Sequence, residues 1–151
     1  MSHRKTIVMM LASLMLTMAV SVAAQTAQAT PLPNPVLYFL APEHFSTNGK
    51  DFVRYKFAVD NSTVYPDSLF AAAPDLPPCG SNTNSSRTWV DIFDSRGKRL
   101  HGFCALGKSS NLNGIWFAVE QDVVPPSYVY IEMTDRQTNK KYKSNLSDTV
   151  Q

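Results

Sequence analysis

The stretch Phe52–Val59 reads FVRYKFAV, and it decides the fold class. Alternate residues of this stretch are apolar or aromatic and fall on one side of an extended chain: Val53, Tyr55, Phe57 and Val59. A repeat of two residues is the period of a β-strand that buries one face. The pattern therefore predicts a half-buried strand, whose apolar side needs a second layer of structure to cover it.

Further short apolar segments lie on both sides of this strand, separated by Pro, Gly, Asn and Ser residues that favour turns. Thr88–Phe93 and Arg99–Ala105 flank a turn that contains Gly97, and they are predicted to form a hairpin. The other predicted strands are Val36–Leu40, Ile115–Val119, Tyr128–Thr134 and Lys141–Ser144. About seven short strands predict an all-β chain, an antiparallel immunoglobulin- or fibronectin type III-like β-sandwich, with a small barrel as the alternative.

The N-terminal segment, residues 1–29, differs in composition from the rest. A basic start is followed by the uncharged run Ile7–Ala24 and by the small residues Ala27-Gln28-Ala29. This pattern indicates the helix of a secretory signal peptide. An uncleaved membrane anchor is the alternative, because the run approaches the length that spans a bilayer. We expect residues 30–151 to be one periplasmic or secreted domain, without stable membrane insertion after cleavage.

Removal of the predicted signal peptide changes the charge balance. Arg4 and Lys5 are its only charged residues, so the 14 basic residues of the chain fall to 12 and match the 12 acidic ones. A neutral chain lacks the basic excess that binding to phosphates requires, which excludes nucleic acid as a general partner. Met133 is the one methionine of six that remains, so a copper site built on several thioethers is excluded as well.

The chain has two cysteines, Cys79 and Cys104. Export would place them in an oxidising compartment, and an even number without Cys-x-x-Cys spacing favours a disulfide over a redox or zinc site. We therefore expect Cys79 to pair with Cys104, with two free thiols as the alternative.

A long segment, residues 60–87, interrupts the regular spacing of the predicted strands. It is far longer than the usual connection between strands, and such segments are typically functional or disordered. It carries several prolines and four large apolar or aromatic residues that require burial: Tyr65, Leu69, Phe70 and Leu76. A short helical stretch is predicted at Asp67–Ala73, stopped by Pro74. We expect an ordered excursion docked on the domain.

A resemblance to one group of proteins covers nearly the whole of the mature chain and is clearest in five segments: Leu76–Val90, Gly102–Leu106, Ile115–Ala118, Asp135-Arg136 and Tyr142–Asn145. With their spaced Cys79, Trp89 and Cys104, they resemble small exported bacterial proteins that have a single fibronectin type III-like domain. The resemblance implies the fold, export and a disulfide. It implies no activity or ligand, because sandwich folds host many unrelated functions.

Two of the predicted strands bring aromatic residues to one face. If the aliphatic residues of Thr88–Phe93 and Tyr128–Thr134 point inward, four aromatic side chains share the outer face of the sheet: Trp89, Phe93, Tyr128 and Tyr130. Exposed aromatic patches bind peptides or sugars, and we include the nearby Arg87 as a candidate binding residue. We favour the alternative that the apolar residues of the excursion cover this patch. A further alternative is that Trp89 faces inward beside the disulfide.

Catalytic and metal-binding residues are sparse. His44 and His101 lie in no nucleophile motif and have no metal-ligand spacing, so no catalytic base is assigned. Four carboxylates lie near predicted strand ends, where they would form a calcium site if the strands were neighbours: Asp91, Asp94, Glu132 and Asp135. Ion pairs with nearby arginines, among them Arg87, Arg96 and Arg136, are the favoured interpretation of these carboxylates.

The sequence therefore predicts an exported, non-catalytic binding or interaction module of the cell envelope, without a cofactor or a bound metal. Its expected partner is a protein, a peptide or a glycan. The alternatives are a periplasmic hydrolase, a calcium-dependent protein that uses carboxylates at strand ends, and a purely structural envelope component. Three Asn-x-Ser/Thr sequons, at Asn61, Asn84 and Asn145, are relevant only in a source that glycosylates exported proteins.

Overall fold

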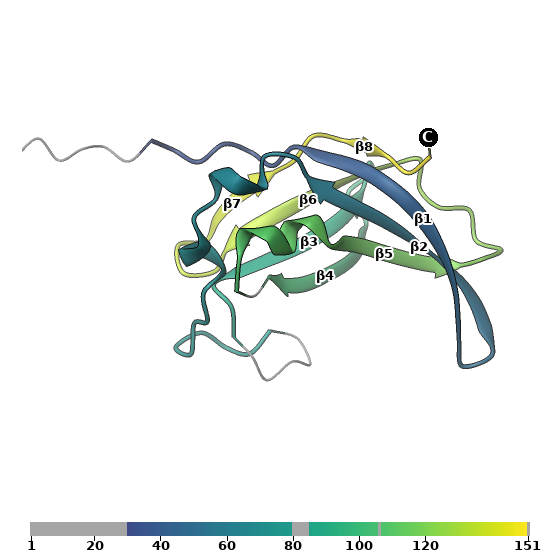
Figure 1. The fold of residues 1–151 in the computed structure, drawn as a ribbon, viewed down its shortest axis with the longest axis horizontal. Helices are drawn as coiled ribbons and strands as arrows, with labels where there is room; N and C mark the ends of the chain where they lie inside the picture. The colour runs from purple at the N-terminus through teal and green to yellow at the C-terminus, as the bar shows by residue number, and fades with distance from the viewer. Residues whose placement is uncertain (1–29, 80–84, 106, 151) are drawn as a thin grey trace, which may run out of the picture. The chain divides into compact units, whose positions relative to one another are not determined.

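The alternating stretch forms β2 (Lys50–Val59), the middle strand of a three-stranded antiparallel sheet (Figure 1). In the computed structural model, which describes residues 30–79, 85–105 and 107–150, β1 (Leu37–Thr47) and β5 (Ile115–Glu120) pair with its two edges. Val53, Phe57 and Val59 are buried, as the alternation predicts. The predicted signal peptide lies outside the described residues.

The second sheet has five antiparallel strands. Its main path is β4 (Arg99–Ala105), β3 (Thr88–Asp94), β6 (Tyr128–Asp135) and β7 (Lys140–Lys143), and β8 (Ser147–Asp148) also pairs with β6. The predicted hairpin is confirmed as β3 and β4. Gly97 in its turn has a φ of 85°, which glycine adopts without strain.

β1 is much longer than the predicted strand Val36–Leu40. It continues to Thr47 and turns into β2 through Asn48 and Gly49, whose φ angles are 50° and 72°. Positive φ at both central residues is typical of a two-residue type I′ hairpin turn, for which Asn-Gly is a preferred sequence. A register shift lies between Phe39 and Ala41, and the residues that follow it are mostly polar and exposed, so the second half of β1 shows no apolar alternation.

The two sheets pack face to face over one hydrophobic core. Each contributes fully buried side chains, including Phe57 and Phe117 from the first sheet and Ile92 and Ile131 from the second. No α-helix occurs among the described residues, and none of their helices is long and apolar enough to cross a membrane. The described chain is therefore an all-β, sandwich-like structure.

The excursion packs where β3 begins and where β4 and β6 end (Figure 1). Its described residues contain the short 3-10 helices η1 (Ser62–Val64) and η2 (Asp67–Phe70), and η3 (Ser109–Asn113) contacts both. The expectation of an ordered, docked segment is confirmed for the described residues. The expected disulfide is also present, and it joins Cys79 at the far end of the excursion to Cys104 in β4, with a Cα–Cα distance of 5.8 Å.

Candidate functional site

The outer face of the second sheet carries the four predicted aromatic side chains, Trp89, Phe93, Tyr128 and Tyr130, which we call the aromatic face. The residues that alternate with them are fully or almost fully buried: Val90, Ile92, Val129, Ile131 and Met133. Phe93 lies opposite Tyr130 in the pairing of β3 with β6, and their rings stack with centroids 5.3 Å apart. Tyr128 is 47% exposed, and the other three rings are partly exposed.

Among the described residues of the excursion, the largest side chains do not lie over the aromatic face, so the favoured prediction is wrong for Tyr65, Leu69 and Phe70. Tyr65, Leu69 and Phe70 belong to the core cluster between the sheets. Burial in the core removes these side chains from water on all sides, whereas a flat outer face would cover only one side of each. The alternative that Trp89 faces inward beside the disulfide is wrong in its direction: Trp89 lies opposite Cys104, but Val90 next to it fills the core and Trp89 faces outward.

A row of four charged side chains crosses the aromatic face. Asp91 in β3 lies directly opposite Glu132 in β6, an arrangement of like charges that is unfavourable by itself. Arg99 compensates Asp91 through an Nε–Oδ1 contact of 2.5 Å, and Lys141 compensates Glu132 through an Nζ–Oε1 contact of 2.6 Å. The hydrogen bond to Glu132 raises the pKa of Lys141. The order across the sheet is therefore Arg99 in β4, Asp91 in β3, Glu132 in β6 and Lys141 in β7.

Cations also lie over the rings themselves. The Arg99 guanidinium is 5.7 Å from the centroid of the Trp89 ring, and the Lys143 ammonium is 4.0 Å from that of Tyr130. Aromatic faces attract cations through the ring quadrupole. The aromatic face therefore offers rings for stacking next to both hydrogen-bond donors and acceptors.

Gly102 in β4 makes room for this arrangement. A Cβ atom at Gly102 would overlap the Arg99 guanidinium and would lie 2.5 Å from Asp91 Oδ1 and 2.8 Å from Trp89 Cζ2. We expect Gly102→Ala to displace Arg99 and break its pair with Asp91, at a cost in unfolding free energy of about 1 kcal/mol. Urea unfolding measures this cost, and Gly114→Ala, whose Cβ would meet nothing closer than 3.8 Å, is the matched control.

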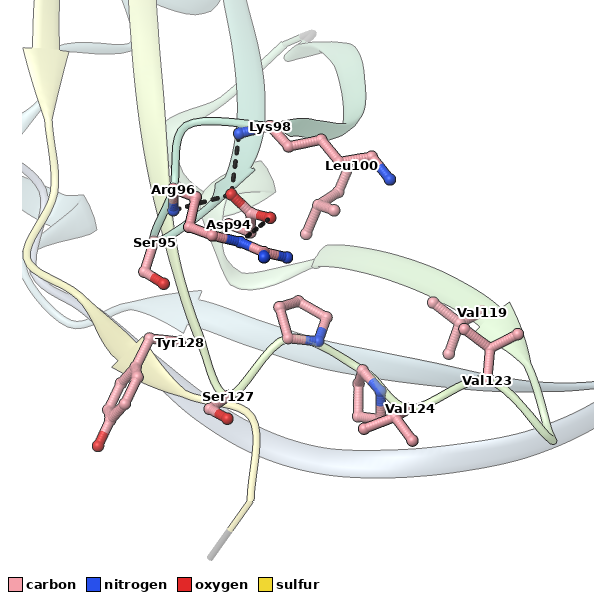
Figure 2. Close-up of a pocket in the computed structure, with 12 residues that line it drawn as sticks. Asp94, Ser95, Arg96, Lys98, Leu100, Val119, Val123, Val124, Ser127 and Tyr128 are labelled. Carbon is pink, nitrogen blue, oxygen red and sulfur yellow. Dashed lines mark hydrogen bonds and ion pairs between the residues drawn. The ribbon is translucent and has the colours of Figure 1, made fainter.

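A groove of about 560 Å³ adjoins the aromatic face, and Tyr128 belongs to both (Figure 2). One wall is the turn between β3 and β4, and the other is the loop between β5 and β6. Its lining includes Asp94, Ser95, Arg96, Lys98, Leu100, Val119, Val123, Val124, Pro125, Pro126, Ser127 and Tyr128.

Asp94 holds the turn of this groove together. Its Oδ1 accepts hydrogen bonds from the backbone N–H groups of Lys98 at 2.8 Å and of Arg96 at 2.9 Å. These N–H groups, with that of Lys98 contributing most, lower the pKa of Asp94. The carboxylate is therefore engaged by the backbone of its own turn.

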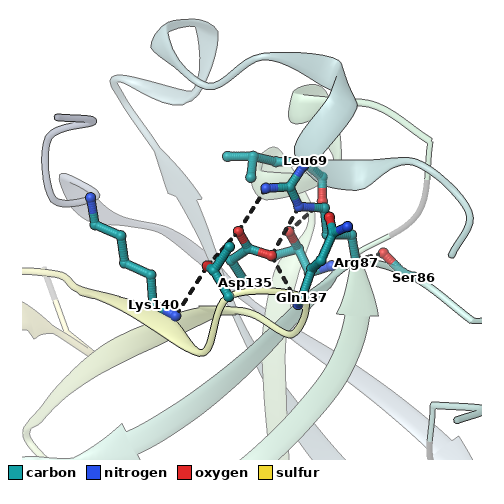
Figure 3. A network of polar contacts seen from close by, with 8 residues as sticks. Leu69, Ser86, Arg87, Asp135, Gln137 and Lys140 are labelled. Atoms are coloured by element: carbon teal, nitrogen blue, oxygen red, sulfur yellow. Dashed lines mark hydrogen bonds and ion pairs between the residues drawn. The ribbon is translucent and has the colours of Figure 1, made fainter. Parts of the chain in front are cut away.

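Arg87, the fifth candidate binding residue, is paired with a carboxylate of its own chain and is partly exposed. Its guanidinium donates two hydrogen bonds to Asp135, Nε to Oδ1 at 2.9 Å and Nη2 to Oδ2 at 2.7 Å (Figure 3). Asp135 also accepts hydrogen bonds from the Thr138 hydroxyl and the Gln137 N–H. These contacts, led by the one with Arg87, lower the pKa of Asp135 to about 2.

The four carboxylates considered for calcium do not converge. Asp91 and Glu132 lie on the outer face, whereas Asp94 and Asp135 are buried at opposite ends of the pairing of β3 with β6. No group of three or more His, Cys, Asp or Glu side chains in the described part of the chain is placed to hold a metal ion. Asp91, Asp94 and Asp135 instead pair with Arg99, Arg96 and Arg87.

Two of the three sequons have structural roles. The Asn61 side chain accepts a hydrogen bond from the N–H of Val36 at 2.9 Å. The Asn145 side chain accepts the N–H of Leu37 and donates to its carbonyl, at 2.8 and 2.9 Å. Both amides anchor the start of β1, whereas Asn84 lies outside the described residues.

One cluster escaped the sequence analysis. The Arg54 guanidinium lies between two rings on the first sheet, 4.7 Å from the Phe45 centroid and 4.6 Å from the Trp116 centroid. The Trp116 ring also stacks on His101 in β4 at 5.0 Å, and burial, followed by the charge of Arg99, lowers the pKa of His101. The available signal was that Arg54 falls on the polar side of the alternating stretch, but Phe45 lies in a part of β1 that was not predicted and Trp116 is far away in the sequence.

Comparisons of this chain with protein-family models, with curated proteins and with solved structures find no match.

Proposed function

We propose that this chain is an exported, non-catalytic binding module of the cell envelope with a fibronectin type III-like sandwich, and that its aromatic face contacts a protein, peptide or glycan partner. The observation that carries the proposal is that the rings of the aromatic face are exposed or partly exposed to solvent. The excursion, the segment best suited to cover it, contributes Tyr65, Leu69 and Phe70 to the core instead.

The strand order supports the fibronectin type III-like assignment. In constant-type immunoglobulin domains, the fourth strand belongs to the same sheet as the first, second and fifth. Here β4 pairs with β3 in the other sheet, and β1, β2 and β5 form a sheet of their own. This sheet composition is typical of fibronectin type III domains.

The chemistry of the aromatic face supports binding. Its rings provide flat apolar area at a low cost in side-chain entropy, and aromatic residues are enriched at the energetic centres of interfaces. Asp91, Glu132, Arg99 and Lys141 are already paired with one another, so their exposed atoms form an ordered set of donors and acceptors around the rings. A preorganised surface loses less entropy on binding.

The two tryptophans of the chain allow a direct test, because Trp89 lies on the aromatic face and Trp116 on the other sheet. In Trp116→Phe, all tryptophan emission comes from Trp89. We expect envelope components that bind Trp116→Phe to shift this emission. The reciprocal variant, Trp89→Phe, should retain an unchanged Trp116 signal under the same conditions.

Tyr130→Ala provides the affinity measurement. Removal of a central aromatic contact should weaken capture of the same components by at least about tenfold. Val64→Ala, an exposed position on η1, should capture them like the parent chain. Equal capture by Tyr130→Ala, Phe93→Ala and the parent chain, with all three folded, would refute the proposed role of the aromatic face.

A further inference from the structure

The groove beside the aromatic face has one cationic wall. The Arg96 side chain is 88% exposed, and its Nε is 3.8 Å from Asp94 Oδ2, at the long end of the range for an ion pair. The Asp94 carboxylate accepts hydrogen bonds from backbone N–H groups of its own turn, and it therefore neutralises the Arg96 and Lys98 side chains only in part. Lys98 adds a second cation to the same turn (Figure 2). This wall attracts anionic groups.

The opposite wall is apolar and exposed. Val124 is 89% exposed and Val123 is 49% exposed, and Pro125 and Pro126 follow them in the loop. Proline fixes φ and has no N–H, so this stretch of the loop is stiff and offers apolar contact rather than backbone donors. Val123 and Val124 therefore offer apolar contact area to a ligand in the groove.

We propose that this groove binds a segment of a polypeptide partner in which an acidic residue lies next to an aliphatic one. A Glu or Asp carboxylate of that segment pairs with Arg96 and Lys98, and an adjacent aliphatic side chain packs against Val123, Val124 and Pro125. A guanidinium matches the planar geometry of a carboxylate and can bind both of its oxygens. The site is separate from the aromatic face in its chemistry, although Tyr128 borders both.

The groove is open to solvent, which favours a polypeptide over the other ligand that combines a carboxylate with an apolar part, a free fatty acid. Sites for small apolar ligands enclose most of the ligand surface, whereas the wall at Val124 is almost entirely exposed to solvent. An extended peptide needs only one side of its chain covered, which suits a groove with two unlike walls.

The test uses short peptides in which one Glu lies among Val, Leu and Pro, and a matched set in which Gln replaces the Glu. Amide NMR shifts locate the contact, and fluorescence anisotropy gives the affinity. We expect shifts at Arg96, Lys98, Val123 and Val124, with binding of the Glu set at least about tenfold tighter than that of the Gln set. Binding should weaken as salt is raised, because the charges on the cationic wall are exposed.

Substitutions in each wall measure the contribution of that wall to peptide binding. Arg96→Glu/Lys98→Glu retains the backbone N–H groups that bind Asp94 and should lower the affinity by more than about tenfold. Val124→Ser should lower it several-fold without affecting the core. Lys108→Glu, at an exposed lysine outside the groove, should bind like the parent chain.

Three outcomes would overturn the inference. They are equal binding of the Glu and Gln sets, shifts located outside the groove, and binding of the chain to vesicles that contain phosphatidylglycerol but to neither peptide set. The proposal for the aromatic face is tested separately by Tyr130→Ala, because Tyr130 does not line the groove.

Discussion

Phe70→Ala is expected to lower the free energy of unfolding by about 3–5 kcal/mol, the usual cost of truncating a buried phenylalanine to alanine. Phe70 lies on the excursion, yet it is 0% exposed and belongs to the core cluster with Phe57, Ile92 and Ile131. Its carbonyl accepts a hydrogen bond from the N–H of Gly107 at 2.7 Å, which further fixes its position. Urea unfolding of residues 30–151, with the disulfide oxidised, measures the effect.

Val64→Ala is the matched control. Val64 is also an apolar residue of the excursion, but it is 46% exposed and lies outside the core cluster. Its truncation should change the unfolding free energy by less than about 0.5 kcal/mol. Similar small effects of the two substitutions would show that the excursion is an appendage of the sandwich and not a part of its core.

The excursion also shows where prediction from the sequence stops. Prolines and apolar residues in residues 60–87 predict an ordered, docked segment, and the structure confirms this for the described residues. The destination of Phe70 depends on the space between the two sheets, which is determined by contacts far apart in the sequence. Local patterns hold no information about that space, so the choice of the aromatic face as its destination was wrong.

Strand prediction succeeded where one alternating pattern spans the whole strand, as in β2, β3 and β6. It failed for the second half of β1, because residues 42–47 are mostly polar and exposed and have no apolar alternation, although Asn48-Gly49 was a readable turn signal. β8 has only two residues and contains no pattern to read.

Of the two candidate sites, the aromatic face could be predicted from the sequence and the groove could not. Alternation alone places Trp89, Phe93, Tyr128 and Tyr130 on one face, because the period of a strand fixes which side chains share a side. The groove unites a turn and a loop that belong to different strand pairs, so its two walls have no common pattern. Arg96 and Val124 line one groove because β6 pairs with β3, a contact between segments that are far apart in the sequence.

Asp135 provides the second large expected effect, because it is buried and paired with Arg87. Its pKa is about 2 in the folded chain, against a usual value near 4 in the unfolded chain. A lowered folded-state pKa stabilises the protein above the unfolded pKa, and this stability is lost as the pH falls through the folded pKa. The difference corresponds to about 2 kcal/mol, present at neutral pH and lost between about pH 5 and pH 2.

Asp135→Asn should therefore lower the unfolding free energy at neutral pH by about 2 kcal/mol and flatten its decline below pH 5. Urea unfolding at a series of pH values compares this variant with the parent chain. Asp122→Asn, at an exposed site in the loop between β5 and β6, should retain the slope of the parent. Asp94 has a lowered pKa too, so Asp135→Asn retains some acid sensitivity. Parallel curves for Asp135→Asn and the parent would contradict this prediction, because the charge of Asp135 would then be stabilised equally in the folded and unfolded chains.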